Sequence, residues 1–360
     1  MELTPLLLLA GTETAAIEGI SAAGASAQAR RFTAAADAEL LLLGPAAPRG
    51  HALPPRPAGV SPALIGHVVR RALQLLQLTQ VIDLGAPVAP AVPHLRLPAP
   101  ESSGPAACLS SGTAMPVLRV ERLLQRADRL CQHWPAGAPV LLCECVPGGT
   151  STALAVLEGL GIAAIGLVGG SLRQPVHGLK AQLVQRGLAA AGLQQQASGA
   201  LAGSALARAV LAAVGDPMLV LAAGLCLNLA GRGHQVVLAG GSQMAAVLAL
   251  ALALAPEAAR QQLAAHAQVV TTAWVLSDPG NDLRLLVERI GQRWGVAPQL
   301  QASSLRFGSC RNPALRDYER GFIKEGVGAG GLAWLWEQSG RSPEALAAAC
   351  DRAMESWASG

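Results

Sequence analysis

The sequence predicts an α/β protein: a mostly parallel sheet covered by helices on both faces, with helical extensions at the ends of the chain. Short apolar runs with the length of buried strands alternate with longer segments of helical spacing. Hydrophobic residues make up 51% of the 360 residues and charged residues only 14%. Most segments are therefore expected to be buried, as the strands of a parallel sheet are.

Apolar runs bounded by glycine, proline or polar residues are predicted as strands. In chain order they are 6–10, 39–43, 80–83, 139–143, 163–168, 235–239, 269–272 and 300–307. Helices are predicted where apolar residues recur at helical spacing, and Ser61-Pro62 and Asp216-Pro217 each provide an N-cap followed by proline at the first helical position. Helices are predicted over 61–78, 120–133, 153–160 and 278–290. Others are predicted to begin near 15, near 178, at 216 and after 243. One or two more are expected within 187–213, and a last helix closes the chain.

We expect residues 1–360 to form a single domain. Residues 44–62 are rich in proline, glycine and arginine and are predicted as a surface excursion. Residues 84–115 carry many prolines without a sustained period and are predicted as a long loop, a feature that in compact enzymes tends to be functional or disordered. The segment 332–360 is predicted to be helical and to pack on the domain.

Composition argues against several classes of protein. A net charge of +4 and the absence of interleaved aromatic and basic residues give no reason to expect a nucleic acid partner. The seven cysteines lie mostly in apolar surroundings, which indicates buried free thiols in a reducing compartment. Because no second pair follows Cys143 and Cys145 at zinc-ligand spacing, we expect neither a metal nor another cofactor.

Two apolar segments invite a membrane interpretation. Residues 236–255 are long enough to span a bilayer, but Gly240 and Gly241 interrupt them. The first eleven residues contain Glu2 where a signal peptide has basic residues, and their apolar run is too short. We expect a soluble cytoplasmic protein with no membrane partner; a membrane-embedded protein is the weakest alternative.

The stretch from Glu144 to Thr152 changes within nine residues from a buried strand to a helix that hydroxyl residues open. Gly148 and Gly149 allow close backbone approach, and the free N–H groups of the first helical turn, at Thr150 and Ser151, favour a phosphate or carboxylate. An ordinary strand-to-helix turn with a hydroxyl N-cap explains the stretch alone equally well. Glu144 favours a site, because open α/β sheets bind ligands at the carboxyl ends of their strands.

Loops around Thr12, Ser242 and Glu325 repeat this combination of glycine, hydroxyl and isolated carboxylate. Their convergence with the Thr150 loop at one sheet edge would form a pocket with phosphate donors and one or two acids. Chance recurrence in a chain rich in glycine and alanine is the competing interpretation. The chain has no GxxxxGK[ST] motif and no GxGxxG at the 148–149 turn, which argues against nucleoside triphosphate hydrolysis and dinucleotide binding.

Five motifs follow one another in a recognisable order: 144–152, Lys180, 215–218, 237–244 and 324–330. Together they resemble the nicotinate-nucleotide–dimethylbenzimidazole phosphoribosyltransferase family of cobalamin nucleotide-loop assembly. The resemblance to its classical enzymes is specific from about Leu141 to Gly331. Over nearly the whole chain the sequence is similar to a sparsely characterised branch of that family, which also carries the motifs at 11–15 and 318–321.

The resemblance implies a Rossmann-like phosphoribosyltransferase domain, usually dimeric, so a homodimer is expected. Its substrates would be nicotinate mononucleotide and a benzimidazole-type base, and its products an α-riboside 5′-phosphate and nicotinate. The family's catalytic base matches Glu325, its second glutamate Glu144, and its phosphate-binding lysine Lys180. The other substrate-binding positions expected are Gly148, Gly149, Thr150, Ser151, Gly240, Gly241, Ser242, Gly326 and Gly328.

The chain departs from the family at two motifs. Classical members read Glu-Met-Gly-Ile-Gly-Asn-Thr-Thr at the positions of residues 144–151, and Val327 replaces the threonine of a Gly-Thr-Gly-Ala motif. The acceptor therefore stays open: adenine, another purine or a phenolic compound could replace dimethylbenzimidazole. The alternative function is a non-catalytic nucleotide-binding or regulatory protein of the same fold, with Glu325 a surface charge in a glycine turn and Lys180 a residue of a solvated helix face.

Overall fold

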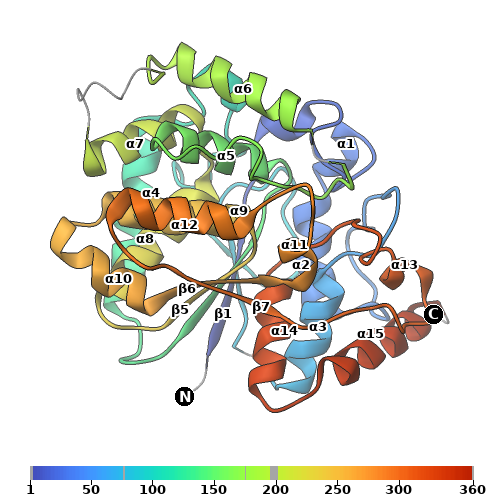
Figure 1. The fold of residues 1–360 in the computed structure, drawn as a ribbon. Helices are drawn as coiled ribbons and strands as arrows, with labels where there is room; N and C mark the ends of the chain where they lie inside the picture. Colours follow the sequence, from blue (N-terminus) through green and yellow to red (C-terminus); the bar gives the residue numbers. More distant parts are fainter. Residues whose placement is uncertain (1–2, 76–77, 175, 195–201, 359–360) are drawn as a thin grey trace.

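A seven-stranded sheet forms the centre of the computed structural model, which describes residues 3–75, 78–174, 176–194 and 202–358 (Figure 1). All neighbouring strands are parallel, in the order β3-β2-β1-β4-β5-β6-β7. The strands are β1 (Thr4–Leu9), β2 (Gln80–Asp83), β3 (Leu95–Arg96), β4 (Val140–Cys145), β5 (Val236–Ala239), β6 (Ala267–Thr272) and β7 (Gln299–Ser303). The α/β class and the parallel sheet predicted from sequence are confirmed.

Helices cover both faces of the sheet (Figure 1). One face carries α4 (Val117–Gln132), α5 (Gly149–Gly159), α6 (His177–Ala190), α7 (Gly203–Val214), α8 (Pro217–Gly231), α9 (Ser242–Leu254), α10 (Arg260–His266) and α12 (Leu283–Trp294). The other carries α2 (Thr33–Leu43), α3 (Ala63–Ala72), α13 (Pro313–Arg316), α14 (Ala329–Gln338) and α15 (Pro343–Ala358). Short helices η1 (Glu13–Ala16), α1 (Ala27–Arg30), η2 (Leu109–Ser111), η4 (Glu257–Ala259) and α11 (Ala273–Leu276) lie in the connections.

The central strands are apolar on both faces, because each face has its own core. In β1, Leu6 and Leu8 belong to the core under α4 to α9, whereas Leu7 and Leu9 belong to the core under α2, α3 and α14. This alternation explains why these strands appear in the sequence as continuous apolar runs.

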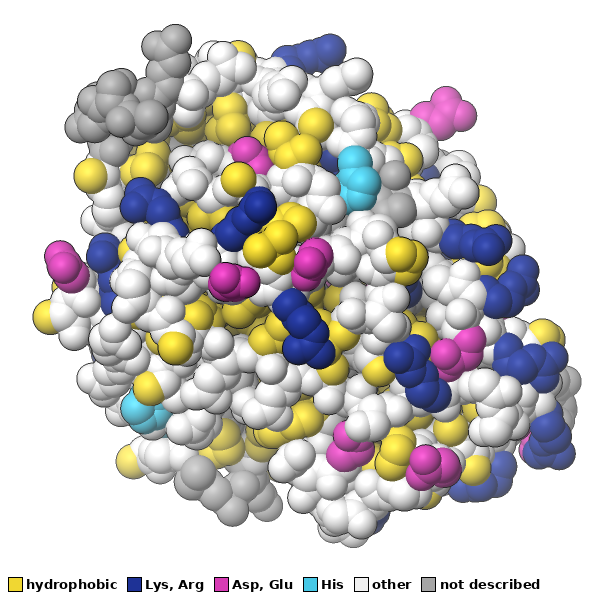
Figure 2. Space-filling view, in the orientation of Figure 1, with side chains coloured by type: hydrophobic (Ala, Val, Ile, Leu, Met, Phe, Trp, Pro, Cys, Tyr) yellow, Lys and Arg dark blue, Asp and Glu magenta, His cyan; other side chains and the backbone are white. Residues whose placement is uncertain are grey.

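The apolar composition also follows from buried helices. In α9 the residues from Met244 to Leu254 are all buried, although the helix is only 13 residues long, which corresponds to about 20 Å. No helix within the described ranges is long and apolar enough to cross a membrane. On the face seen in Figure 2, basic and acidic side chains are interspersed.

Three element predictions are wrong. Residues 39–43, predicted as a strand, form the end of α2, because a buried helix of alanine and leucine has no polar face to reveal its period. Residues 163–168 are a turn rather than a strand: Gly166 is left-handed (φ 85°), and the Glu158 carboxylate accepts from the N–H groups of Ala164 and Ile165 at 2.5 and 2.8 Å. The helix predicted for 278–290 begins only at Leu283, where Asp282 is the N-cap.

Other boundaries differ less. The helix predicted for 61–78 ends at Ala72, and the one predicted near residue 15 is the single 3-10 turn η1. The predicted loop 84–115 contains β3 and η2. The helical stretch expected within 187–213 falls partly on residues 195–201, which lie outside the described ranges. The C-terminal helical segment begins at Ala329, three residues before the predicted boundary at 332, and packs in the core of α2 and α3.

The order of the strands creates a switch point beside β1. From β1 the chain passes to β2 and β3 on one side, then returns to β4 and continues to β7 on the other. The carboxyl ends of β1 and β4 lie side by side there, with Leu9 in register with Cys145. In open α/β sheets the crevice outside this point is the place where ligands bind.

Helix α14 approaches the sheet very closely at Gly331, where an added Cβ would lie 2.4 Å from the Ala239 Cβ in β5. Since backbone and short side chains form this contact, we expect Gly331→Ala to lower the free energy of unfolding by about 1–3 kcal/mol, as overpacked cores do. Urea denaturation measures it. Gly178→Ala in α6 is the matched control: no atom lies within 4 Å of its added Cβ, and it should leave stability unchanged or raise it by up to about 1 kcal/mol. Equal stability of both variants would contradict the close packing of α14.

Candidate active site

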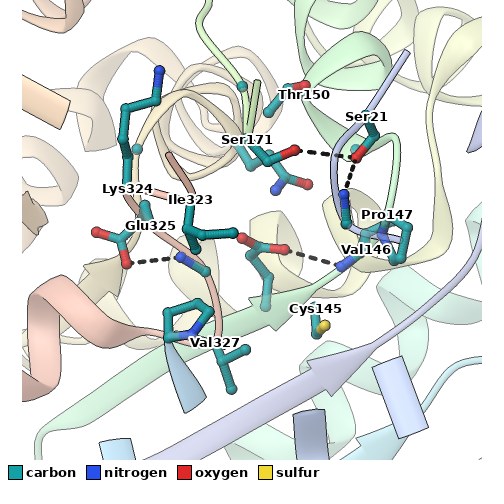
Figure 3. Close-up of a pocket in the computed structure, with 18 of the residues that line it drawn as sticks. Ser21, Cys145, Val146, Pro147, Thr150, Ser171, Ile323, Lys324, Glu325 and Val327 are labelled. Carbon is teal, nitrogen blue, oxygen red and sulfur yellow. Dashed lines mark hydrogen bonds between the residues drawn. The ribbon is translucent and has the colours of Figure 1, made fainter. Parts of the chain in front are cut away.

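A pocket opens at the carboxyl edge of the sheet, next to the switch point (Figure 3). Segments distant in sequence form its walls: the β4–α5 turn, the loop 169–171, the start of α9, the loop 323–327, α2, the segment before α3, and the positions Ser21, Ala23, Val275 and Asn281. The pocket therefore draws on both faces of the sheet.

Two helices begin at the pocket without a side-chain cap. Helix α5 follows Gly148, which has a left-handed backbone (φ 81°), and α9 follows Gly241. The two helix starts lie close together, since an added Cβ at Gly149 would come within 1.9 Å of the Gln243 Oε1. At the start of α5 the N–H groups of Gly149 and Ser151 donate to the carbonyls of Val146 and Gly148, both at 2.9 Å. The positive ends of both helix dipoles converge at the pocket, an arrangement that favours a phosphate group.

Lys180 supports this wall from behind. Its Nζ donates to the Thr150 Oγ1 at 2.9 Å and to the carbonyl of Gly169 at 2.5 Å, and the side chain is buried. Burial and, to a smaller extent, the positive charge of Lys324 together lower the pKa of Lys180 to about 8. The ammonium group lies 3.2 Å from where a Cβ of Gly170 would stand, so its charge is close to the pocket although it does not line it.

Glu325 is held by four hydrogen bonds. Its Oε1 accepts from the N–H groups of Gly326 and Gly330 at 3.1 and 3.0 Å. Its Oε2 accepts from the Thr271 Oγ1 and the N–H of Thr272, both at 3.0 Å. Burial raises the pKa of Glu325 to about 7, while these hydrogen bonds act in the opposite direction. A carboxyl group with this pKa is partly ionised near neutral pH, as a general base should be.

Glu144 lies at the end of β4 with fewer partners. Its Oε2 accepts from the N–H of Val146 at 3.1 Å, a bond that Figure 3 draws. Burial and the nearby charge of Glu325 raise the pKa of Glu144 to about 8. The two carboxyl groups therefore stand in one pocket with different hydrogen-bond environments, and the pKa of each lies above its ordinary value.

The loop that carries Glu325 has a strained backbone. Ile323, Lys324 and Val327 have left-handed φ angles of 67°, 66° and 54°, a conformation that is rare for β-branched residues. The N–H of Val327 donates to the carbonyl of Glu144 at 3.0 Å, and this bond ties the loop to β4. Strain of this kind persists only where the surroundings enforce it, and it clusters at functional sites.

A buried ion pair closes one side of the pocket. The Nζ of Lys324 pairs with the Asp278 carboxylate and donates to the carbonyl of Leu172 at 3.2 Å. Asn281 donates to the same carboxylate at 2.8 Å and also lines the pocket. Lys324 is therefore committed to Asp278, and its ammonium points away from Glu325 in Figure 3.

Eight of the residues predicted for the site line the pocket. They are Glu144, Gly148, Gly149, Thr150, Gly241, Ser242, Glu325 and Gly326. Four others do not line it: Ser151 and Lys180 are buried behind the wall, Gly240 contacts the Met244 side chain, and Gly328 is the N-cap of α14, packed against Cys143. Ser151, Lys180, Gly240 and Gly328 thus lie behind the wall of the pocket, and their predicted part in substrate binding stays a prediction.

The loop around Thr12 is not part of the pocket. Thr12 is the N-cap of η1 and borders a separate hollow beside Pro147. Asp216, whose side chain accepts from the Leu219 N–H at 3.1 Å, is the N-cap of α8, as the sequence suggested. Of the four loops expected to converge, three do.

Several pocket residues had no signal in the sequence. Asp37 lies in a helix whose end was predicted as a strand, and Arg56 lies in the proline-rich excursion. Gln243 and Lys324 lie within the motifs 237–244 and 324–330, but they were not among the residues predicted for the site. Among the described residues no group of three or more His, Cys, Asp or Glu side chains could hold a metal ion.

The raised carboxyl pKa values predict a pH-dependent stability. From pH 5 to 8 the folded protein holds more protons on Glu144 and Glu325 than the unfolded chain, because their pKa values lie above the ordinary 4.5. The free energy of unfolding therefore falls as pH rises through this window. Glu144→Gln and Glu325→Gln should each reduce this loss, on the order of 1–3 kcal/mol, in urea titrations at pH 5, 6, 7 and 8.

Glu288→Gln is the control for this measurement, since Glu288 is exposed on α12, outside the pocket. It should retain the pH dependence of the wild type. If both pocket variants also retained it, the carboxyl groups of Glu144 and Glu325 would not be protonated in the folded state at neutral pH.

Comparison with solved structures supports the fold. The crystal structure of nicotinate-nucleotide-dimethylbenzimidazole phosphoribosyltransferase from Thermus thermophilus matches with a TM-score of 0.58 and 21% identity, over 98% of this chain and 83% of that one. A structure of CobT from the same organism gives a TM-score of 0.58 and 20% identity, over 98% and 84%. The predicted fold resemblance to this family is confirmed.

Relatives by sequence are considerably closer. No protein-family model matches the chain. A UPF0284 protein of Parasynechococcus marenigrum (strain WH8102) is 50% identical over 355 residues, which cover 97% of this chain and 86% of that protein. A UPF0284 protein of Gloeobacter violaceus (strain ATCC 29082 / PCC 7421) is 43% identical over 357 residues, which cover 97% and 87%. With identity of this degree over nearly its whole length, the chain belongs to the UPF0284 family.

Proposed function

We propose that this protein is a nicotinate-nucleotide-dependent phosphoribosyltransferase. It would transfer phosphoribose from nicotinate mononucleotide to a benzimidazole-type or related aromatic base, releasing nicotinate and an α-riboside 5′-phosphate for the lower ligand of a cobamide. One observation carries the proposal: two uncapped helix N-termini and two carboxyl groups, of which Glu144 is buried and Glu325 partly buried, share a pocket at the switch point of the sheet. The fold likeness to phosphoribosyltransferases supports it.

The phosphate would occupy the start of α5 and α9. There the positive ends of the two helix dipoles meet at Gly148, Gly149 and Gly241, and Lys180 adds a positive charge behind Thr150. The ribose would then lie beside Glu144 and Glu325, the carboxyl groups of the pocket that the β4 end and the loop 323–327 supply.

The chemistry requires a base but no general acid. The ring nitrogen of the acceptor attacks the anomeric carbon, and the bond to the pyridinium nitrogen breaks with its electron pair on that nitrogen, so nicotinate leaves with a neutral ring. As the new bond to the anomeric carbon forms, the N–H of the other nitrogen of the base becomes acidic, and its proton passes to Glu325, whose pKa of about 7 suits proton transfer near neutral pH. A second carboxyl group, Glu144, would stabilise positive charge that develops on the ribose when it is ionised.

Glu325 needs a free lone pair to accept that proton. Three of its four donors are backbone N–H groups, but the fourth is the Thr271 hydroxyl, which can rotate to donate elsewhere. Rotation would free the Oε2 toward the pocket. The same four bonds also favour a second candidate function, a non-catalytic nucleotide-binding or regulatory protein in which Glu325 only anchors the start of α14.

Nicotinate release separates the two functions, because both predict that the nucleotide binds. The purified protein would be incubated with nicotinate mononucleotide and each member of a panel of aromatic bases, and nicotinate and the riboside phosphate would be quantified by liquid chromatography and mass spectrometry. Release with at least one base supports the transferase. Folded protein that binds the nucleotide but releases nicotinate with no base would be a non-catalytic binder.

Glu325→Gln tests the assignment of the base. We expect nicotinate release to fall by about 10²–10⁴-fold, since the amide cannot take the proton, while the Kd for nicotinate mononucleotide stays within about threefold. Calorimetry gives the Kd, and the chromatographic assay gives the rate. Glu344→Gln, exposed on α15 and outside the pocket, is the control and should turn over like the wild type. Unchanged turnover in Glu325→Gln would mean that Glu325 is not the general base and would make Glu144 the next candidate.

A further inference from the structure

The side of the pocket opposite α5 and α9 has a separate polar group. Thr33 and Asp37 of α2, together with Arg56, line the pocket there. Helix α2 belongs to the core on the other face of the sheet, so this group stands across the sheet edge from the uncapped helix starts. The mechanism proposed above does not use it.

Arg56 is buried and only partly hydrogen-bonded. Its side chain is 6% exposed, and its Nη2 donates to both carboxylate oxygens of Asp37, at 3.1 and 3.2 Å. Its Nε and Nη1 have no hydrogen-bond partner among the described residues. A guanidinium has five N–H donors, and leaving some of them buried and unpaired is costly, so a ligand in the pocket that accepts from them gains affinity.

The surroundings hold this guanidinium in place. Asp37 also accepts from the Ser61 Oγ at 2.6 Å. The segment between Arg56 and Ser61 is tied to the loop before Glu325, since the Gly59 N–H donates to the Asp317 carboxylate at 2.8 Å and the Tyr318 hydroxyl donates to the Val60 carbonyl at 2.9 Å. The Arg56 donors are thus preorganised relative to the loop that carries Glu325.

The charge balance determines what kind of group these donors suit. The positive charge of Arg56 is already paired with Asp37, and the carboxyl groups of Glu144 and Glu325 line the same pocket. A carboxylate on the ligand would be repelled by these acids. The phosphate of the nucleotide would bind elsewhere, at the start of α5 and α9. What Arg56 has left to offer is hydrogen-bond donors, which match a neutral acceptor atom on an aromatic ring.

We propose that Arg56, positioned by Asp37, determines the specificity for the acceptor base. It selects a neutral aromatic base whose edge carries a hydrogen-bond acceptor, a ring nitrogen or an oxygen substituent. This inference rests on the proposed phosphoribosyl transfer. A base with methyl groups on that edge leaves the Nε and Nη1 donors of Arg56 unpaired and binds about tenfold or more weakly.

The test compares bases that differ on that edge. Calorimetry would give the Kd of adenine, hypoxanthine and 5-hydroxybenzimidazole, against benzimidazole and 5,6-dimethylbenzimidazole, for the wild type and for Arg56→Met. We expect the wild type to bind at least one of the first three about tenfold or more tightly than 5,6-dimethylbenzimidazole, and Arg56→Met to lose that preference. The Kd for nicotinate mononucleotide should change by less than about threefold.

Two further variants keep the result interpretable. Arg56→Met leaves the Asp37 carboxylate buried without its ion-pair partner, so the double variant Asp37→Asn/Arg56→Met, which removes both charges, is measured beside it. Arg126→Met is the matched control: Arg126 pairs with the buried Glu101 but lies outside the pocket, and this variant should keep the wild-type preference.

Two outcomes would overturn the inference. One is a wild type without the preference, or a preference that persists in the double variant. The other is an Arg56→Met protein that binds nicotinate mononucleotide more weakly but nicotinamide mononucleotide as before, since Arg56 would then recognise the nicotinate carboxylate.

Failure of this inference is distinguishable from failure of the proposed transfer. A preference that depends on Arg56, in a protein that releases no nicotinate with any base, would support the subsite and refute the transfer. Equal rates of nicotinate release with 5,6-dimethylbenzimidazole and with adenine, in the wild type and in Arg56→Met alike, would support the transfer and refute the role of Arg56.

Discussion

The backbone hydrogen bond from Val327 to the carbonyl of Glu144 connects the two parts of the chain that supply the pocket acids. It joins the end of β4 to a loop in which three non-glycine residues have left-handed backbones. That bond acts together with the four hydrogen bonds to the Glu325 carboxylate and the Lys324–Asp278 ion pair, which hold the same loop. The arrangement of the acids therefore depends on contacts between β4, β6 and this loop.

Close packing at glycine makes this contact possible. Gly328 and Gly331 allow α14 to lie directly on β4 and β5, against Cys143 and Ala239. The start of α14 consequently lies next to Glu325, and the N–H of Gly330 donates to its carboxylate. Helix α14 thus stabilises the core under α2 and α3 and also orients Glu325, the candidate general base. The packing of this helix and the geometry of the site therefore cannot be altered independently.

Charges in the pocket are arranged so that few of them are fully exposed to a ligand. Burial and the charge of Glu325 raise the pKa of Glu144, and Lys324 is committed to Asp278. Lys180 stands behind the wall, and Arg56 is paired with Asp37. What the pocket presents is directional hydrogen-bond capacity, from helix N–H groups at one side and guanidinium N–H groups at the other, which fits a ligand with one charged end and one neutral aromatic end.

The sequence by itself determined the α/β class, the parallel sheet and three loops of the pocket, because buried strands, glycine turns and uncapped helix starts are encoded within a few neighbouring residues. It failed where that local code is ambiguous, as in α2, whose alanine and leucine residues fit a buried strand equally well. Only the tertiary structure decided that Lys180 and Ser151 stand behind the wall and that Arg56 and Asp37 face the pocket. Their roles depend on contacts between residues far apart in the chain, and no local pattern records those.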